Sequence, residues 1–115
     1  MRRPFAYVTA AWGEDQEENI KNAVGYCREL YELGYTPLCP ALSLSLFLSD
    51  ESYQERRDKR EMARAFLCRS QMLVICGEEI SETVLRDMAA ARRMWITVMT
   101  LKGVRSVKER RREHS

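Results

Sequence analysis

The sequence has few of the residues that most often build metal sites. Its 115 residues include one histidine and four cysteines. The histidine, His114, is in the C-terminal tail, and the cysteines are Cys27, Cys39, Cys68 and Cys76. No two cysteines form a CxxC pair, the spacing that commonly marks a zinc site. We therefore expect neither a bound metal nor a cofactor.

Long apolar runs are also missing. No run approaches the roughly 18 apolar residues that a membrane span needs, so we expect no membrane partner. The opening "MRRPFAYVTAAWGEDQ" has basic residues, but its short apolar stretch leads straight into acids, which predicts a first strand and not a signal peptide. Each cysteine has apolar neighbours, where a reduced thiol behaves as a small hydrophobic group. Free thiols are typical of a cytoplasmic protein, which is the location we expect.

A large net charge is missing as well, because the net charge is only +2. Residues 14–18, "EDQEE", are acidic, and the end of the chain, "RSVKERRREHS", is basic. A basic tail can bind nucleic acid, but this one has no interleaved aromatic residues and no RNA-binding motif. We therefore interpret residues 104–115 as a solvated basic tail, either a short helix or disordered, and expect no nucleic-acid partner.

What is present is an alternation of strand and helix patterns. Residues 5–10 predict a strand, and the following helix has apolar residues at helical spacing from Ile20 to Tyr31 and ends at Gly34. "YTPLCP" predicts a second short strand, which completes a strand–helix–strand unit. The next segment, "ALSLSLFLSD" (41–50), predicts a loop or short helix with an apolar underside, because too little chain precedes it for another parallel strand.

The second half of the chain repeats this alternation. "SYQERRDKREMARAFLCRS" predicts a helix whose inward residues are Met62, Ala65 and Phe66 and whose outer face is charged. "QMLVIC" predicts a third strand, Ser81 is a candidate N-cap of the third helix, and residues 95–100 predict a fourth strand. We expect an α/β fold in residues 1–103, a small Rossmann-like or flavodoxin-like three-layer sandwich. Its parallel sheet would have four to five strands in the order 2-1-3-4.

In sheets of this kind, ligands bind beyond the carboxyl ends of the strands, where the strand order reverses. The loops there are "AAWGED" and "GEEISE". This placement makes candidate ligand-binding residues of Thr9, Ala10, Ala11, Trp12, Gly77 and Ser81. Trp12 either stacks on a base or packs as a lid on "LSLFL". Ser81 either only caps its helix or also exposes backbone N–H groups to a phosphate.

The order of these pieces is similar to that of a known family. The first strand ends in the turn "YVTAAWG", the next segment reads "ENIKNAVGYCRELYELGYTPLCP", and "MLVICG" leads to "ISETVLRDMAAARRMWITV". Together they cover about residues 4–101 and resemble the small uncharacterised branch of the nucleoside 2-deoxyribosyltransferase-like superfamily. The resemblance implies a pocket for a nucleoside or nucleotide-like small molecule, completed by residues of a neighbouring subunit.

The resemblance also implies roles for two carboxylates. The transferases attack the sugar C1′ with a glutamate on the helix after the third strand, as retaining glycosidases do. That position falls on Asp87, which is then a nucleophile or a hydroxyl acceptor, or else a surface carboxylate paired with Arg86 or Arg93. Glu82, on the first turn of the same helix, either assists as acid or is a favourable charge at the helix N-terminus.

Several positions depart from the family pattern. Asp87 is one methylene shorter than glutamate, and a misplacement of about 1 Å can cost roughly a hundredfold in rate. Thr83 and Trp95 replace glycines, Ala11 and Thr97 replace prolines, and Gln71 replaces an acid. These departures favour binding of a nucleoside or nucleotide over chemistry, as in small phage or mobile-element proteins that sense or sequester such ligands. The alternatives are an N-glycosidic-bond enzyme (a deoxyribosyltransferase or nucleoside hydrolase) and an interaction module with a vestigial pocket.

Residues 41–48, "ALSLSLFL", form an apolar surface that a lone domain of this size would struggle to cover. Together with the shared pockets that the resemblance implies, this segment predicts a homodimer or a higher oligomer with residues 41–48 near the interface. Light scattering at micromolar protein concentration checks this prediction, and a monomeric mass would contradict it.

Overall fold

The computed structural model describes residues 2–113, and a parallel β-sheet lies at its centre. The strands are β1 (Phe5–Ala10), β2 (Thr36–Leu38), β3 (Met72–Cys76) and β4 (Thr97–Thr100). They pair in the order β2-β1-β3-β4 and all run in parallel, which confirms the predicted topology. The two middle strands are almost entirely apolar because each is buried on both of its faces.

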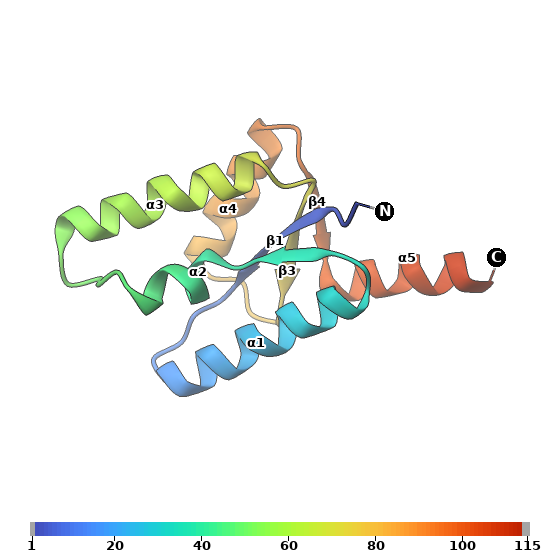
Figure 1. The fold of residues 1–115 in the computed structure, drawn as a ribbon, viewed down its shortest axis with the longest axis horizontal. Coiled ribbons are helices and arrows are strands. Elements are labelled where there is room, and N and C mark those ends of the chain that lie inside the picture. Colours follow the sequence, from blue (N-terminus) through green and yellow to red (C-terminus); the bar gives the residue numbers. More distant parts are fainter. Residues whose placement is uncertain (1, 114–115) are drawn as a thin grey trace.

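Helices cover both faces of the sheet and complete the predicted three-layer sandwich (Figure 1). They are α1 (Gln16–Glu32), α2 (Pro40–Ser43), the 3-10 helix η1 (Leu44–Leu46), α3 (Tyr53–Cys68), α4 (Glu82–Arg93) and α5 (Leu101–Glu113). One core cluster joins α1 and α5 to the sheet through Leu30, Val74 and Val104. The other joins α3 and α4 to the opposite face through Leu67 and Val84. Within residues 2–113, no helix is long and apolar enough to span a membrane.

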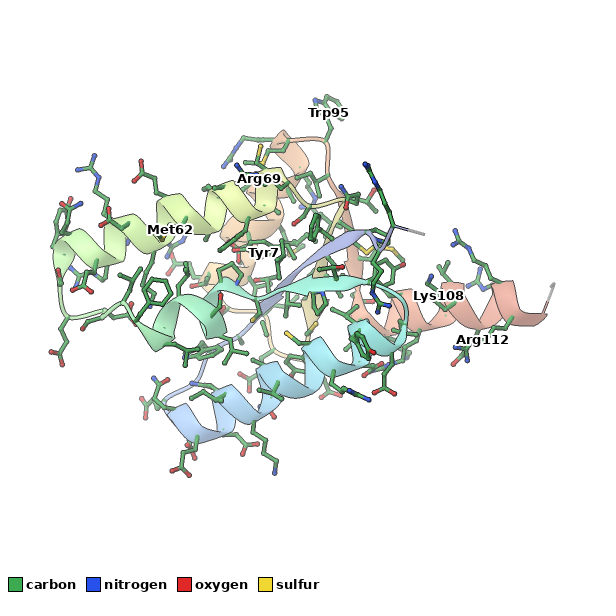
Figure 2. All side chains as sticks on the ribbon, in the orientation of Figure 1. Tyr7, Met62, Arg69, Trp95, Lys108 and Arg112 are labelled. Carbon is green, nitrogen blue, oxygen red and sulfur yellow. The ribbon has the colours of Figure 1, made fainter. Side chains whose placement is uncertain are left out.

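Two helices differ from the sequence-based prediction in the face that they bury. On α1, Leu30 is buried, whereas Ile20 and Val24 at one edge of the apolar stripe are 43% and 52% exposed. On α3, Met62 is 42% exposed and projects outward in Figure 2, and Leu67 is the fully buried residue. The sequence-based prediction centred the inward face of α3 on Met62 and Ala65. It gave these two apolar residues more weight than Leu67, which lies at a different angle around the helix axis.

The basic segment at the end of the chain is the helix α5 as far as residue 113, and His114 lies outside the described residues. Val104 is 1% exposed and belongs to the core. Arg105 donates to the carboxylate of Glu29 on α1, and Lys108 lies over the ring of Tyr35 at 4.9 Å. The first turns of α5 are therefore packed on the domain, and its last turns carry basic side chains (Figure 2).

Residues 41–48 form α2, η1 and the start of the loop that leads to α3. Leu44 is buried, whereas Leu46 and Phe47 are 77% and 65% exposed. The apolar underside that the sequence predicted is therefore present at Leu44. The segment also presents two large apolar side chains outward.

Two glycines allow opposite predictions for stability. Gly77 follows β3 with a φ of +80°, and a Cβ there would lie 2.8 Å from Tyr26 Oη. Gly77→Ala should lower the free energy of unfolding by about 1–2 kcal/mol, because this is roughly the cost of an L residue in the left-handed region.

Gly25→Ala is the matched control within α1. No atom lies within 4 Å of the added methyl group, so the free energy of unfolding should rise by about 0.5–1 kcal/mol. Urea denaturation measures both changes. Equal changes in the free energy of unfolding would contradict the claim that Gly77 requires a left-handed backbone and Gly25 does not.

Candidate functional site

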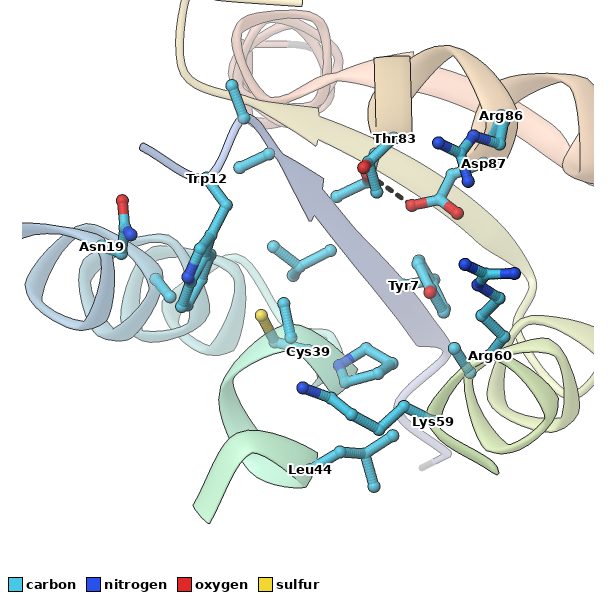
Figure 3. A pocket seen from close by; sticks show the side chains of 18 of the residues that line it. Tyr7, Trp12, Asn19, Cys39, Leu44, Lys59, Arg60, Thr83, Arg86 and Asp87 are labelled. Atoms are coloured by element: carbon cyan, nitrogen blue, oxygen red, sulfur yellow. Dashed lines mark hydrogen bonds between the residues drawn. The ribbon is translucent and has the colours of Figure 1, made fainter. Parts of the chain in front are cut away.

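A cavity of about 590 Å³ lies beyond the carboxyl end of β1, between α1, α3 and α4 (Figure 3). Residues 7–12 of β1 and its following loop form the floor. The turn from β2 into α2 closes one side with Cys39 and Pro40. This is the place at which parallel sheets of this order bind ligands, and the volume is in the usual range for a small-molecule site.

Asp87 and Thr9 join α4 to the central strand inside this cavity. Thr9 is only 4% exposed, and its hydroxyl donates to Asp87 Oδ2 at 2.7 Å. Asp87 lies between the first and second turns of α4, and its carboxylate turns back toward the strand end (Figure 3). The interpretation of Asp87 as a surface carboxylate paired with Arg86 or Arg93 does not describe this geometry, since Asp87 lines the cavity and its hydrogen bond is to Thr9.

The surroundings of Asp87 act on its acidity in opposite directions. Burial raises the pKa of the Asp87 carboxyl above its ordinary value. The Thr9 hydrogen bond and the charges of Arg64 and Arg86 lower this pKa and offset part of the effect of burial. Tyr7 lies on the same wall, and burial together with the neighbouring Asp87 raises the pKa of its phenol. The Tyr7 hydroxyl therefore stays protonated and can act as a hydrogen-bond donor.

Trp12 lies on the opposite side of the cavity from Asp87 (Figure 3). It is half-buried, packs against the core on the α1 side of the sheet, and donates from Nε1 to Gln16 Oε1 at 3.2 Å. The loop that carries it is held by Asn19, whose amide bonds the N–H and the carbonyl of Gly13 at 2.9 and 2.8 Å. Sequence reasoning missed Asn19, although an asparagine one turn before the buried Ala23 is a polar residue on the inward face of the helix.

Five cationic side chains line the cavity, and we call them the cationic wall: Arg56, Lys59, Arg60 and Arg64 of α3, and Arg86 of α4. The sequence-based prediction placed the charged residues of α3 on an outer, solvated face. Since the buried face of α3 is centred on Leu67 and not on Met62, Arg60 and Arg64 lie beside that buried face and border the cavity. Arg56, Arg60 and Arg64 are four residues apart and therefore lie on one side of the helix. This spacing is the feature of the sequence from which the cationic wall could have been predicted.

The structure brings some of the predicted site residues together and leaves others outside. Asp87, Thr9, Ala10, Ala11 and Trp12 all line the cavity. The remaining three, which are Glu82, Gly77 and Ser81, do not line it.

Each of these three has another structural place. The Glu82 side chain is 87% exposed and forms an ion pair with Arg86 at 3.8 Å. Ser81 caps α4 by accepting from the Val84 N–H at 3.3 Å. Gly77 packs against the side chain of Tyr26, which itself lines the cavity. Among the residues that the structure describes, no cluster of His, Cys, Asp or Glu side chains could hold a metal ion.

A parallel sheet in the order 2-1-3-4, flanked by helices and with a cavity at its switch point, is a Rossmann-like fold of the kind that a deoxyribosyltransferase also has. The chain belongs to the family described as domain of unknown function DUF7768, whose model matches residues 4–101. Among solved structures it is similar to the 2-deoxyribosyltransferase of the psychrotolerant bacterium Bacillus psychrosaccharolyticus. The similarity covers 84% of this chain and 70% of that chain, with 14% sequence identity and a TM-score of 0.64. No curated protein sequence matches the chain.

The acidity of Asp87 is directly measurable. We expect carboxyl-carbon NMR titration to give Asp87 a pKa above the ordinary aspartate value, because burial outweighs the stabilising contacts. Thr9→Val should raise this pKa further, since it removes the hydrogen bond to the ionised form. With a raised folded-state pKa, the folded chain binds more protons than the unfolded chain as Asp87 ionises, so stability falls as the pH rises through that window. A wild-type pKa at or below the ordinary value would contradict this account.

Proposed function

We propose that the chain binds a nucleoside-type ligand in the cavity beyond β1. The observation that carries the proposal is the buried Thr9–Asp87 hydrogen bond at the switch point, because it holds a carboxylate in place facing the cavity. A carboxylate has two oxygens and several acceptor positions, so Asp87 can accept from a sugar hydroxyl while it keeps the bond to Thr9. The similarity to a deoxyribosyltransferase fold supports the same ligand class.

Trp12 supplies the second part of the proposed site. Its indole is half-buried in the loop after β1 and lies across the cavity from Asp87 (Figure 3). A flat aromatic side chain in this place can stack on a nucleobase regardless of which base it is. A base at Trp12 and a sugar at Asp87 would place the two halves of a nucleoside along the carboxyl end of β1.

Binding without chemistry is the function we favour, in keeping with the sensing or sequestering roles expected from the sequence. Two-carboxylate glycosyl transfer needs a proton donor for the leaving base as well as a nucleophile. Glu82, the expected donor, is 87% exposed and does not line the cavity. Asp50, the other carboxylate on the cavity wall, is already bound to Lys59 Nζ at 2.8 Å. Neither arrangement supports general acid catalysis.

The second candidate function is an N-glycosidic-bond enzyme, and the position of Asp87 in the cavity favours it. In that reaction an Asp87 oxygen would form an ester bond to the sugar C1′ as the C1′–N bond breaks. The base leaves with the bonding electrons and takes up a proton, from solvent or from the protonated Tyr7 hydroxyl on the same wall. Water, or a second base in a transferase, then displaces Asp87 from C1′.

Binding and adduct formation separate the two functions. In isothermal titration with the common 2′-deoxynucleosides, Asp87→Asn should weaken the ligand that binds by about 0.5–1.5 kcal/mol, the usual net value of a hydrogen bond. Trp12→Ala should weaken it by about 1–3 kcal/mol through lost stacking. Glu82→Gln is the control and should leave the affinity unchanged, because Glu82 lies outside the cavity. Unchanged affinity in Asp87→Asn would sink the proposal.

Mass spectrometry after incubation with a 2′-fluoro nucleoside tests the enzyme directly. We expect no adduct in the wild type. A covalent glycosyl adduct on Asp87 that disappears in Asp87→Ala would establish the second function in place of the first. In that case Asp87→Glu should keep or raise turnover, since it restores the reach of the family pattern.

A further inference from the structure

The charge of the cavity carries an inference beyond a nucleoside. Its wall holds five cationic side chains and only two carboxylates, Asp50 and Asp87. Both carboxylates already have partners, Asp50 in Lys59 and Asp87 in Thr9. Arg86 is also paired, with Glu82 at 3.8 Å, so among the described residues only Arg56, Arg60 and Arg64 of the wall have no carboxylate partner. A neutral nucleoside would leave the charge of these three arginines unmatched. Anionic oxygens bind guanidinium and ammonium groups through charge-assisted hydrogen bonds, which are roughly twice as strong as neutral ones.

The members of the cationic wall differ in how firmly the protein holds them. The Lys59 side chain is only 16% exposed, and its Nζ bonds Asp50 Oδ1 at 2.8 Å and Ser45 Oγ at 3.3 Å. Arg56 donates to the Asp50 carbonyl at 2.6 Å. These contacts tie the start of α3 to the segment before it and hold Lys59 and Arg56 at the cavity mouth.

Arg60 and Arg64 are different, because within residues 2–113 neither makes an ion pair or a hydrogen bond. Both nevertheless line the cavity. Figure 3 shows Arg60 extended into the cavity beside Tyr7, with Asp87 and Arg86 on the wall above it. Like charges four residues apart on one side of a helix repel each other, and an anion that binds both of them removes the repulsion. The planar guanidinium also matches the geometry of phosphate oxygens through two parallel hydrogen bonds.

We propose that the ligand of this cavity is a 5′-phosphorylated nucleoside whose phosphate is held by Lys59, Arg60 and Arg64. This inference rests on the proposed function and names the class of nucleoside derivative. The arrangement offers a place for each part of a nucleotide, because Figure 3 shows Trp12 on one side of the cavity, Asp87 and Arg60 on the other, and Lys59 below them. The base lies at Trp12, the sugar faces Asp87, and the phosphate is at α3.

The test compares the common 2′-deoxynucleosides, their 5′-monophosphates and 5′-triphosphates, and inorganic tripolyphosphate by isothermal titration. At least one nucleotide should bind about tenfold or more tightly than its own nucleoside, as expected for charge-assisted hydrogen bonds. Its affinity should fall between about 50 mM and about 300 mM sodium chloride, whereas nucleoside affinity should change little. Tripolyphosphate alone should bind more weakly than that nucleotide, because it lacks the contacts at Trp12 and Asp87.

Variants connect the gain in affinity to the proposed residues. Arg60→Gln combined with Arg64→Gln should abolish the difference in affinity between a nucleotide and its own nucleoside. Arg57→Gln is the matched control, an exposed arginine on the same helix that does not line the cavity, and it should leave the difference intact. Circular dichroism verifies that each variant is folded.

The possible failures are distinguishable. If a nucleoside binds and its phosphates add nothing, this inference is overturned and the proposed function stands. If Arg57→Gln removes as much of the gain as the double variant, the attraction is a general effect of charge and the assigned site is wrong. If tripolyphosphate binds as tightly as every nucleotide, the cavity is an anion site without nucleoside recognition. If no probe binds, both proposals are overturned.

Discussion

The hydrogen bond from Thr9 to Asp87 connects the parts of the molecule on which the site depends. It joins the end of the central strand to α4, residues that are far apart in the sequence, and it links the buried Thr9 to the half-buried Asp87. A buried carboxylate without a partner would be costly, so the hydroxyl of Thr9 is what allows Asp87 to stay at the cavity wall. The same bond limits Asp87 to orientations in which its other oxygen faces the ligand space.

The fold was predictable because the hydrophobic pattern and the chain connections agreed for the strands. The short apolar runs at Phe5–Ala10 and Met72–Cys76 indicated buried strands, and the helical segments between strands favoured a parallel sheet in the order 2-1-3-4. Trp12 could be placed in the site because the loop after a strand has a fixed position relative to the sheet, whereas Asp87 was placed there by the resemblance to the transferases. When the hydrophobic pattern and the possible strand connections indicate the same fold, a single sequence is sufficient to predict that fold.

The cationic wall was not predictable in the same way, because it depends on the rotation of α3 about its own axis. Met62 and Leu67 are both apolar and compete to define the inward face, and only packing against the sheet decides for Leu67. A rotation error of this size moves Arg60 and Arg64 from the cavity to solvent. Glu82 was misplaced for a related reason, since proximity to a strand end in sequence does not determine which side of a helix turn a side chain takes.

Charge links the two ends of the proposed site. Arg64 and Arg86 stabilise the ionised form of Asp87 and lower its pKa. Part of the positive potential in the cavity therefore acts on this carboxylate in the absence of a ligand. A phosphate that pairs with the cations of α3 would weaken this field and raise the pKa of Asp87. A carboxylate that accepts hydrogen bonds from Thr9 and from a sugar hydroxyl has less free electron density to attack a carbon atom, so these contacts suit binding better than nucleophilic attack. The electrostatics that attract a nucleotide therefore also act against glycosyl transfer, and the excess of cations and the absence of a proton donor at Glu82 favour the same function.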